Sequence, residues 1–209
     1  MHIPTIEKTT DIEILSFERA LDSAFVPNDS YDINKWLYVP SFYSEYRYIL
    51  GTKGKNPLIC IGINPSTAEP DNLDNTLKSV ERVAFHNGFD SFIMFNVYAQ
   101  RATNPDDMEQ LLNKQLHGEN LKAFEYILNL YSSDNKPAVW AAWGTIIEKR
   151  QYLFDCVTDF IEIGKRYDAN WYTAGKRSKS GHPHHPLYLP KTSILEDFEP
   201  MAYINSFSH

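Results

Sequence analysis

Apolar residues along the chain fall into short continuous runs that alternate with longer segments of helical periodicity. A continuous apolar run such as 57–64 is typical of a central parallel strand that is covered on both faces. Segments in which apolar positions recur every three or four residues are typical of amphipathic helices. The pattern predicts strands at 45–51, 57–64, 89–99, 137–144 and 170–175, and helices at 11–24, 75–88, 104–115, 118–131 and 145–160.

Strands that alternate with helices indicate crossover connections between parallel strands, with helices on both faces of the sheet. We therefore expect an α/β fold: a three-layer αβα sandwich with a mostly parallel central sheet of about four or five strands. The length of 209 residues fits a single domain, 1–209, with residues 1–40 as an N-terminal helical extension packed on it.

Polar residues follow several of these strands directly. Asn64 ends the first central run, Asn96 lies near the end of the second, and a histidine-rich segment, 182–186, follows the last. In parallel α/β sheets, ligands bind in the crevice beyond the carboxyl ends of the strands. The topology therefore predicts that these three segments converge on one pocket.

The residue types at these strand ends suit recognition of a polar ligand. A side-chain amide offers one acceptor oxygen and two donor hydrogens, so Asn64 can orient a water molecule and Asn96 can read the edge of a base. Pro65 fixes the backbone beside Ser66, and Arg101 can bind a phosphate or carboxylate with its planar guanidinium. The structural alternatives are that the two asparagines bond their own turns and that Arg101 is an ordinary ion-pair partner.

Three histidines, His182, His184 and His185, crowd one loop that prolines stiffen. Three imidazoles can ligate a metal, but no other group of Cys, His, Asp or Glu has ligand spacing, so we expect no metal and no cofactor. We favour one imidazole that donates a hydrogen bond to a developing anion.

The basic loop before these histidines carries Lys176, Arg177 and Lys179 with no acidic residue between them. This loop is a candidate phosphate contact. The alternative is that its charged side chains simply face solvent. The net charge of −7 disfavours nonspecific binding to nucleic acid, because phosphate affinity comes mostly from Lys and Arg. The expected partner is therefore a nucleobase-containing small molecule or a short nucleic acid.

Several classes of protein have no support in the sequence. The chain lacks G-x-x-x-x-G-K-[ST], G-x-G-x-x-G and G-x-S-x-G. No motif therefore supports a kinase, a dinucleotide-dependent dehydrogenase or an α/β-hydrolase. No window approaches the ~18 apolar residues of a membrane span, and the N-terminus lacks an apolar signal core. Two cysteines, Cys60 and Cys156, do not make a disulfide framework. We expect a cytoplasmic protein with no membrane partner.

Four segments together resemble the bacterial family catalogued as domain of unknown function 1643. They are "GINPSTAEPDNLDNTL", "FNVYAQRATNP", "AAWG" and "GHPHHPLYL". The resemblance spans roughly residues 45–190 and departs at Asn75, where the family usually has a proline after the aspartate. It implies no established activity.

A more distant resemblance offers an activity. "ICIGINPS", "FIMFNVYAQRA" and "HPHHPLY" are similar to motifs of the uracil-DNA glycosylase superfamily. The resemblance implies an αβα fold in which Asn64 positions the attacking water, Asn96 reads the base and His185 stabilises the departing base anion. Two positions depart from those motifs, since Ser66 replaces a glycine and Leu187 replaces a serine.

These observations lead to the hypothesis of a hydrolase that cleaves an N-glycosidic bond in a nucleobase-containing substrate. Lys176, Arg177 and His182 are then expected to contact the substrate beside the catalytic groups. The alternative is a binding module that uses the same pocket without turnover, and a third hypothesis is a metal-dependent hydrolase built on the histidine cluster.

Overall fold

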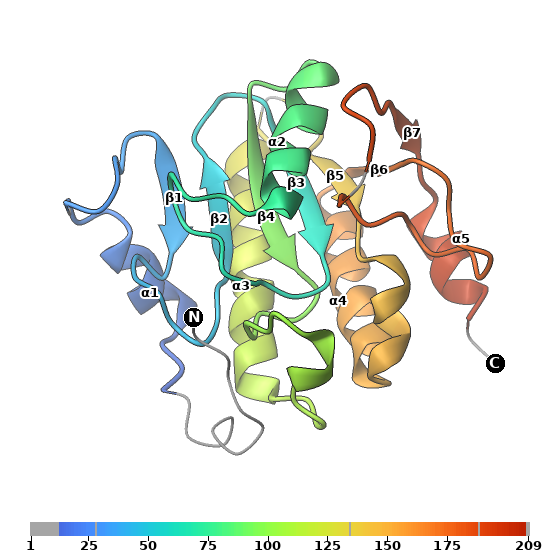
Figure 1. Cartoon of the computed structure of the whole chain (residues 1–209), viewed down its shortest axis with the longest axis horizontal. Helices are drawn as coiled ribbons and strands as arrows, with labels where there is room; N and C mark the ends of the chain where they lie inside the picture. Colours follow the sequence, from blue (N-terminus) through green and yellow to red (C-terminus); the bar gives the residue numbers. More distant parts are fainter. Residues whose placement is uncertain (1–12, 28, 134, 188, 208–209) are drawn as a thin grey trace.

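The computed structural model describes residues 13–27, 29–133, 135–187 and 189–207, and its centre is a seven-stranded sheet (Figure 1). The strands lie in the order β1-β2-β4-β3-β5-β6-β7. Their bounds are β1 Trp36–Val39, β2 Ile49–Thr52, β3 Pro57–Gly62, β4 Ser91–Asn96, β5 Ala138–Ala141, β6 Asn170–Ala174 and β7 Leu195–Asp197.

The sheet is mixed and larger than expected. Strands β4, β3, β5 and β6 pair in parallel at its centre, whereas β1, β2 and β7 join it in antiparallel pairings at the two edges. The prediction of a mostly parallel sheet of four or five strands therefore holds for the centre only. The edge strands β1 and β7 are four and three residues long, too short to leave a clear periodic pattern.

Helices cover both faces of the sheet, as expected. They are α1 Phe17–Ser23, α2 Asn75–His86, α3 Lys114–Tyr131, α4 Tyr152–Arg166 and α5 Pro200–Asn205. In Figure 1, α2 lies in front of the sheet and the α3–α4 pair lies behind it.

The side chains of β3 divide between two apolar clusters, because successive residues of a strand point to opposite faces. Leu58 and Cys60 pack in the cluster that contains the buried side of α2. Ile59 and Ile61 pack in the cluster that contains α3 and α4. All six residues of β3 are buried, so the continuous apolar run reflects burial on both faces.

Two predicted helices differ from expectation. Residues 104–113 form only a short 3₁₀ turn at Pro105–Asp107, whereas the helix expected at 118–131 already begins at Lys114, where Asn113 caps it by accepting from Leu116 N. In the predicted helix 145–160, a 3₁₀ segment, Gly144–Lys149, precedes α4.

The break before α4 lies at Arg150, whose backbone is extended. Its guanidinium donates to the carbonyl oxygens of Asp106, Met108 and Glu109. The arginine thus joins the two irregular segments, which is a tertiary contact that local periodicity does not reveal.

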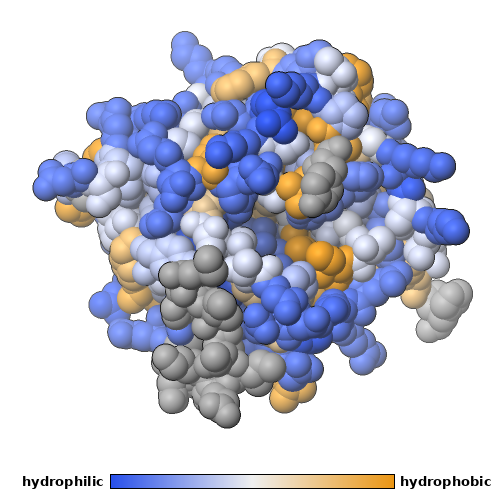
Figure 2. Space-filling model, in the orientation of Figure 1, coloured by the Kyte–Doolittle hydropathy of each residue, from blue (hydrophilic) through white to orange (hydrophobic). Residues whose placement is uncertain are grey.

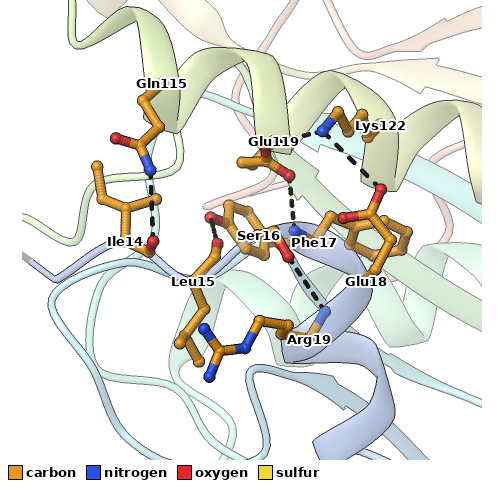
Figure 3. A network of polar contacts seen from close by, with 10 residues as sticks. Ile14, Leu15, Ser16, Phe17, Glu18, Arg19, Gln115, Glu119 and Lys122 are labelled. Carbon is orange, nitrogen blue, oxygen red and sulfur yellow. Dashed lines mark hydrogen bonds and ion pairs between the residues drawn. The ribbon is translucent and has the colours of Figure 1, made fainter.

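The N-terminal segment is partly strand. Residues 36–39, expected within a helical extension, form β1 and pair with β2, while residues 1–12 lie outside the described part of the chain. Helix α1 is attached to α3 by the contact in Figure 3 in which Glu119 Oε2 accepts from Phe17 N at 2.6 Å. The residue before its cap is held separately, because Tyr46 Oη accepts from Leu15 N at 2.9 Å.

The surface on the side of α2 is mostly hydrophilic, and its apolar residues lie in small separate groups (Figure 2). Within the described ranges, no helix combines the length and the apolar character needed to cross a bilayer.

Candidate functional site

The candidate site is a cavity of about 460 Å³ beyond the carboxyl ends of β3 and β4. These strands end in register, with Gly62 opposite Asn96, and the next residues stay paired through Val97 N and Gly62 O at 2.9 Å. The residues that line the cavity include Arg47, Asn64, Ser66, Asn96, His185 and Leu187. Three groups far apart in the sequence, two amides and an imidazole, therefore share one cavity.

Asn64 is held firmly at the edge of this cavity. Its Nδ2 donates to Pro65 O at 3.1 Å and to Ala102 O at 2.6 Å, so both amide hydrogens are engaged by the backbone. Pro65 O also accepts from Ala102 N at 2.9 Å. Asn64 thus bonds its own turn, as the structural alternative expects, but only through Nδ2. Its Oδ1 atom is the group that the amide can offer to a water molecule or ligand.

Asn96 differs because its amide nitrogen has no partner within the described ranges. The residue is 1% exposed, and Nδ2 is buried without a hydrogen bond there. A buried donor without an acceptor costs about 1–3 kcal/mol, so a native structure seldom leaves one without a reason. Because Asn96 also lines the cavity, it is a candidate contact for a ligand there.

Gly62 makes room for the amide of Asn96. A Cβ on Gly62 would lie 2.5 Å from Met94 Cε and 3.2 Å from Asn96 Oδ1. Any larger residue at this strand end would therefore displace side chains that line the cavity, and this close approach explains why a glycine ends β3.

His185 lines the same cavity as a neutral donor. Leu187 N donates to its Nδ1 at 3.3 Å, so the neutral ring carries its hydrogen on Nε2. Burial, helped by His184 and opposed by Asp74, lowers the pKa of His185 to about 4. At neutral pH the imidazole can donate one hydrogen bond without carrying a charge.

Gly144 allows the approach of the histidine loop. Its φ of +66° is in the left-handed region, and a Cβ there would lie 3.2 Å from His185 Cβ. The end of β5 and the histidine loop thus fit together only around a glycine.

Arg101 is buried behind the turn that follows Asn64. Its Nη1 donates to Ser66 O and Ala68 O, its Nη2 donates to Tyr38 Oη at 3.0 Å, and its guanidinium lies over the ring of Tyr43. The arginine therefore fixes the backbone of the turn, whereas Ser66 itself lines the cavity. Neither proposed alternative, a phosphate contact or an ordinary ion pair, describes these contacts.

His182 is buried and engaged on both ring nitrogens. Nδ1 lies 2.8 Å from Tyr203 Oη and Nε2 lies 2.7 Å from Glu148 Oε1, while Phe207 stacks on the ring. These contacts tie the histidine loop to the C-terminal helix. The expectation that His182 contacts substrate is not supported by this placement.

The basic loop divides between two places. Lys176 lines a second cavity of about 410 Å³ that adjoins the first and shares His185 and Leu187 with it. Arg177 instead lies over the ring of Phe198 at 4.9 Å. Only Lys176 is therefore placed near the candidate site.

The three histidines do not converge on one point. His184 Nδ1 donates to His185 O at 2.7 Å, and His182 faces Tyr203. Over the described ranges, no group of three or more His, Cys, Asp or Glu residues is arranged to hold a metal ion.

Sequence reasoning missed Arg47, which precedes β2 and lines the cavity with 1% exposure. It lies in the alternating segment 45–51, where a charged residue suggests a solvent-facing side chain. The only available signal was that Arg47 has large hydrophobic or aromatic neighbours on both sides.

Together these groups can bind a planar polar ligand. The cavity is lined by the amides of Asn64 and Asn96, the imidazole of His185 with its hydrogen on Nε2, and the cation of Arg47. Asp74, which also lines the cavity, caps α2 by accepting from Leu77 N at 2.9 Å. A volume of about 460 Å³ lies in the range of small-molecule sites.

Comparison with known proteins identifies one family. The model of the family described as "Protein of unknown function (DUF1643)" matches residues 47–187, about two thirds of the chain. No curated protein and no solved structure matches the chain. The matched range contains every residue discussed above as lining the cavity. Because the match covers more than half of the sequence, the chain belongs to the DUF1643 family.

Proposed function

We propose that this protein hydrolyses an N-glycosidic bond in a nucleobase-containing substrate. The observation that carries the proposal is the convergence of Asn64, Asn96 and His185 on one cavity at the carboxyl ends of β3 and β4. In this proposal Asn64 orients water, Asn96 holds the base and His185 stabilises the leaving base.

The bond changes follow from these roles. The oxygen of a water molecule bonds to the anomeric carbon of the sugar, and the bond from that carbon to the base nitrogen breaks. The base leaves with the electron pair as an anion, and one proton of the water finally neutralises it. A preorganised donor at the site of developing charge stabilises such a transition state.

The hydrogen bonds of Asn64 support its role with water. Because Nδ2 is held by Pro65 O and Ala102 O, the Oδ1 atom is fixed as an acceptor for a water O–H. An acceptor so fixed holds the water in one orientation, which lowers the entropy cost of reaching the transition state.

His185 suits the leaving group for a related reason. Its low pKa keeps the ring neutral at pH 7, so Nε2–H donates to the base anion without first having to be charged. A neutral imidazole that polarises a developing anion is an established catalytic device.

The similarity of the three segments to motifs of the uracil-DNA glycosylase superfamily also supports the proposal. The three segments follow one another in the same order as those motifs, whose roles are water positioning, base recognition and anion stabilisation. The two departures, Ser66 and Leu187, both line the cavity, so they affect the ligand directly. They favour a second possibility, a binding module for a nucleobase ligand that is not turned over.

The test is a base-release assay with the purified protein. Uracil- and hypoxanthine-containing nucleosides, nucleotides and short oligonucleotides are incubated with wild type, Asn64→Ala, His185→Ala and the surface control His86→Ala. We expect release by wild type and His86→Ala and a loss of about 100-fold or more in the two cavity variants.

The two possibilities give different results in the same assay. Tight binding with unchanged ligand recovered from wild type would replace the hydrolase with a binding module. Equal release by wild type and Asn64→Ala would remove this asparagine from the mechanism.

A further inference from the structure

Arg47 is a buried cation that the proposed hydrolysis does not use. It is 1% exposed and lines the cavity that contains Asn96. Its backbone N donates to Ala99 O at 3.0 Å, and its Nη1 donates to Ala68 O at 3.0 Å. The Nε atom, in contrast, is buried and has no hydrogen-bond partner among the residues that the structure describes.

The charge of Arg47 is not balanced by an ion pair. In the part of the chain that the structure describes, no carboxylate lies within ion-pair distance of Arg47 or of Arg101, which also donates to Ala68 O. Burial and the nearby Arg101 lower the pKa of Arg47 to about 9, against the opposing effect of Asp74. Buried charges in proteins are normally paired, so this cation lacks a counterion.

The opposite wall of the cavity also favours an anion. Residues 75–77, the first turn of the twelve-residue helix α2, line it. Asp74 caps Leu77 N, whereas the amides of Asn75 and Thr76 precede the first intrahelical bond, from Lys78 N to Asp74 O. The positive end of a helix dipole and free backbone N–H groups bind phosphate well.

Asp74 is the group that opposes an anion in this cavity. Inside the cavity it faces the guanidinium of Arg47, while His185 is neutral at pH 7. Behind the wall, Arg101 donates to Tyr38, on which Glu69 also acts, so Arg101 adds no excess positive charge. Arg47 and the first turn of α2 are therefore the groups that favour an anion in this cavity.

We propose that Arg47 and the first turn of α2 form a phosphate subsite, so that the ligand of the cavity is a nucleotide and not a free base or nucleoside. The inference rests on the proposed function for the base, which Asn96 holds. The guanidinium and the backbone amides would each donate to phosphate oxygens, a geometry that arginine supports better than lysine.

The experiment compares nucleosides with their 5′-monophosphates by calorimetry on the full chain. Deoxyuridine and deoxyinosine are the nucleoside probes, and inorganic phosphate is the competitor. For wild type we expect the monophosphates to bind about tenfold or more tightly than the nucleosides and inorganic phosphate to compete with them.

Two variants of Arg47 and one control variant assign this preference to a residue. Arg47→Gln is expected to remove the preference for the monophosphate, and Arg47→Lys to keep part of it. Arg82→Gln, which removes an exposed cation of α2 that lines neither cavity, is expected to leave it unchanged. Retention of the preference in Arg47→Gln would overturn the proposal.

A measurement on the wild type covers the case in which Arg47→Gln does not fold. Inorganic phosphate is titrated into ¹⁵N-labelled protein while the arginine Nε–H signals are followed, with Arg47→Lys identifying the signal. A shift of the Arg47 Nε–H signal supports the subsite, and no shift at saturating phosphate refutes it.

The same data separate this inference from the proposed hydrolysis. Phosphate binding at Arg47 without any base release would contradict the hydrolase and retain the subsite. Base release with equal binding of nucleoside and monophosphate would contradict the subsite and retain the hydrolase.

Discussion

At the scale of single residues, the cavity is defined by an amide that is buried without a partner. Asn96 Nδ2 makes no hydrogen bond to the described residues, so Asn96→Ala removes a group that serves the ligand more than the fold. We expect base binding to weaken about tenfold or more while the free energy of unfolding changes by less than about 2 kcal/mol.

Calorimetry and urea unfolding of the same samples check this prediction, with Asn129→Ala on the exposed side of α3 as the control. A variant that unfolds easily and binds the ligand normally would show that Asn96 is structural.

His185 gives a pH dependence with a defined sign. Its pKa falls from 6.5 to about 4 on folding, so the unfolded chain binds more protons between these values. The free energy of unfolding therefore loses this contribution as the pH falls from 6.5 towards 4, and retains all of it above 6.5.

Urea unfolding of wild type and His185→Gln across pH 4–7.5 checks this effect of protonation. The difference between the two proteins should be constant above pH 6.5 and shrink below it. A difference that does not change with pH would show that the imidazole titrates alike in both states.

The residues of the site differed in how well the sequence revealed them. Asn64 and Asn96 could be found because polar residues at the ends of buried strands must face the same edge of the sheet. Arg47 could not be found, because its burial depends on the loop at Ala68 and on the end of β4, which are distant in sequence. The protein partners of His182, Tyr203 and Glu148, could not be foreseen because they come from other segments.

At the scale of elements, the last residue of β3 has to be small. In Gly62→Ala, the new Cβ would push Met94 and the Asn96 amide, both of which line the cavity. We expect ligand binding to fall measurably, because the end of Met94 has to swing aside and the Asn96 amide has to shift by a few tenths of an ångström.

Gly118→Ala is the matched control in α3, where a Cβ meets nothing within 4 Å. This control should stabilise the protein by about 0.5–1 kcal/mol, as measured by urea unfolding, because alanine favours a helix interior over glycine. Normal ligand binding by Gly62→Ala would contradict the role given to β3.

Elements were predictable where their pattern was long and local. The continuous apolar runs of β3 and β4 and the apolar faces of α2 and α4 are visible in the local sequence of each element. The helix predicted at 104–115 was wrong because Asn113 caps a later start and Arg150 holds the preceding carbonyls in an irregular path. Such long-range contacts leave no periodic trace.

At the scale of the whole molecule, the fold extends beyond the residues that the family model matches. Helix α5 follows that range, yet Tyr203 accepts from Trp143 Nε1 at 3.0 Å and contacts His182, and Phe207 stacks on His182. A chain that ends at residue 199 lacks Tyr203 and Phe207, so it exposes their partners Trp143 and His182 and frees the histidine loop.

We expect this truncated chain to lose about 3–5 kcal/mol of stability and its near-ultraviolet circular dichroism. Tyr203→Phe, which keeps the ring and removes only the hydroxyl, should lose about 1–3 kcal/mol. A truncated chain with native spectra and native stability would show that the C-terminal helix is dispensable.

The two edges of the sheet bear on how the protein behaves at high concentration. Strand β7 is three residues long and carries Glu196 and Asp197, and β1 is four residues long and is followed by Pro40. Short edges that bear acidic or proline residues are poor templates for strand addition from another copy. The mixed sheet thus protects its apolar centre from fibrillar self-association, a protection that replacing Glu196 and Asp197 by valine would remove.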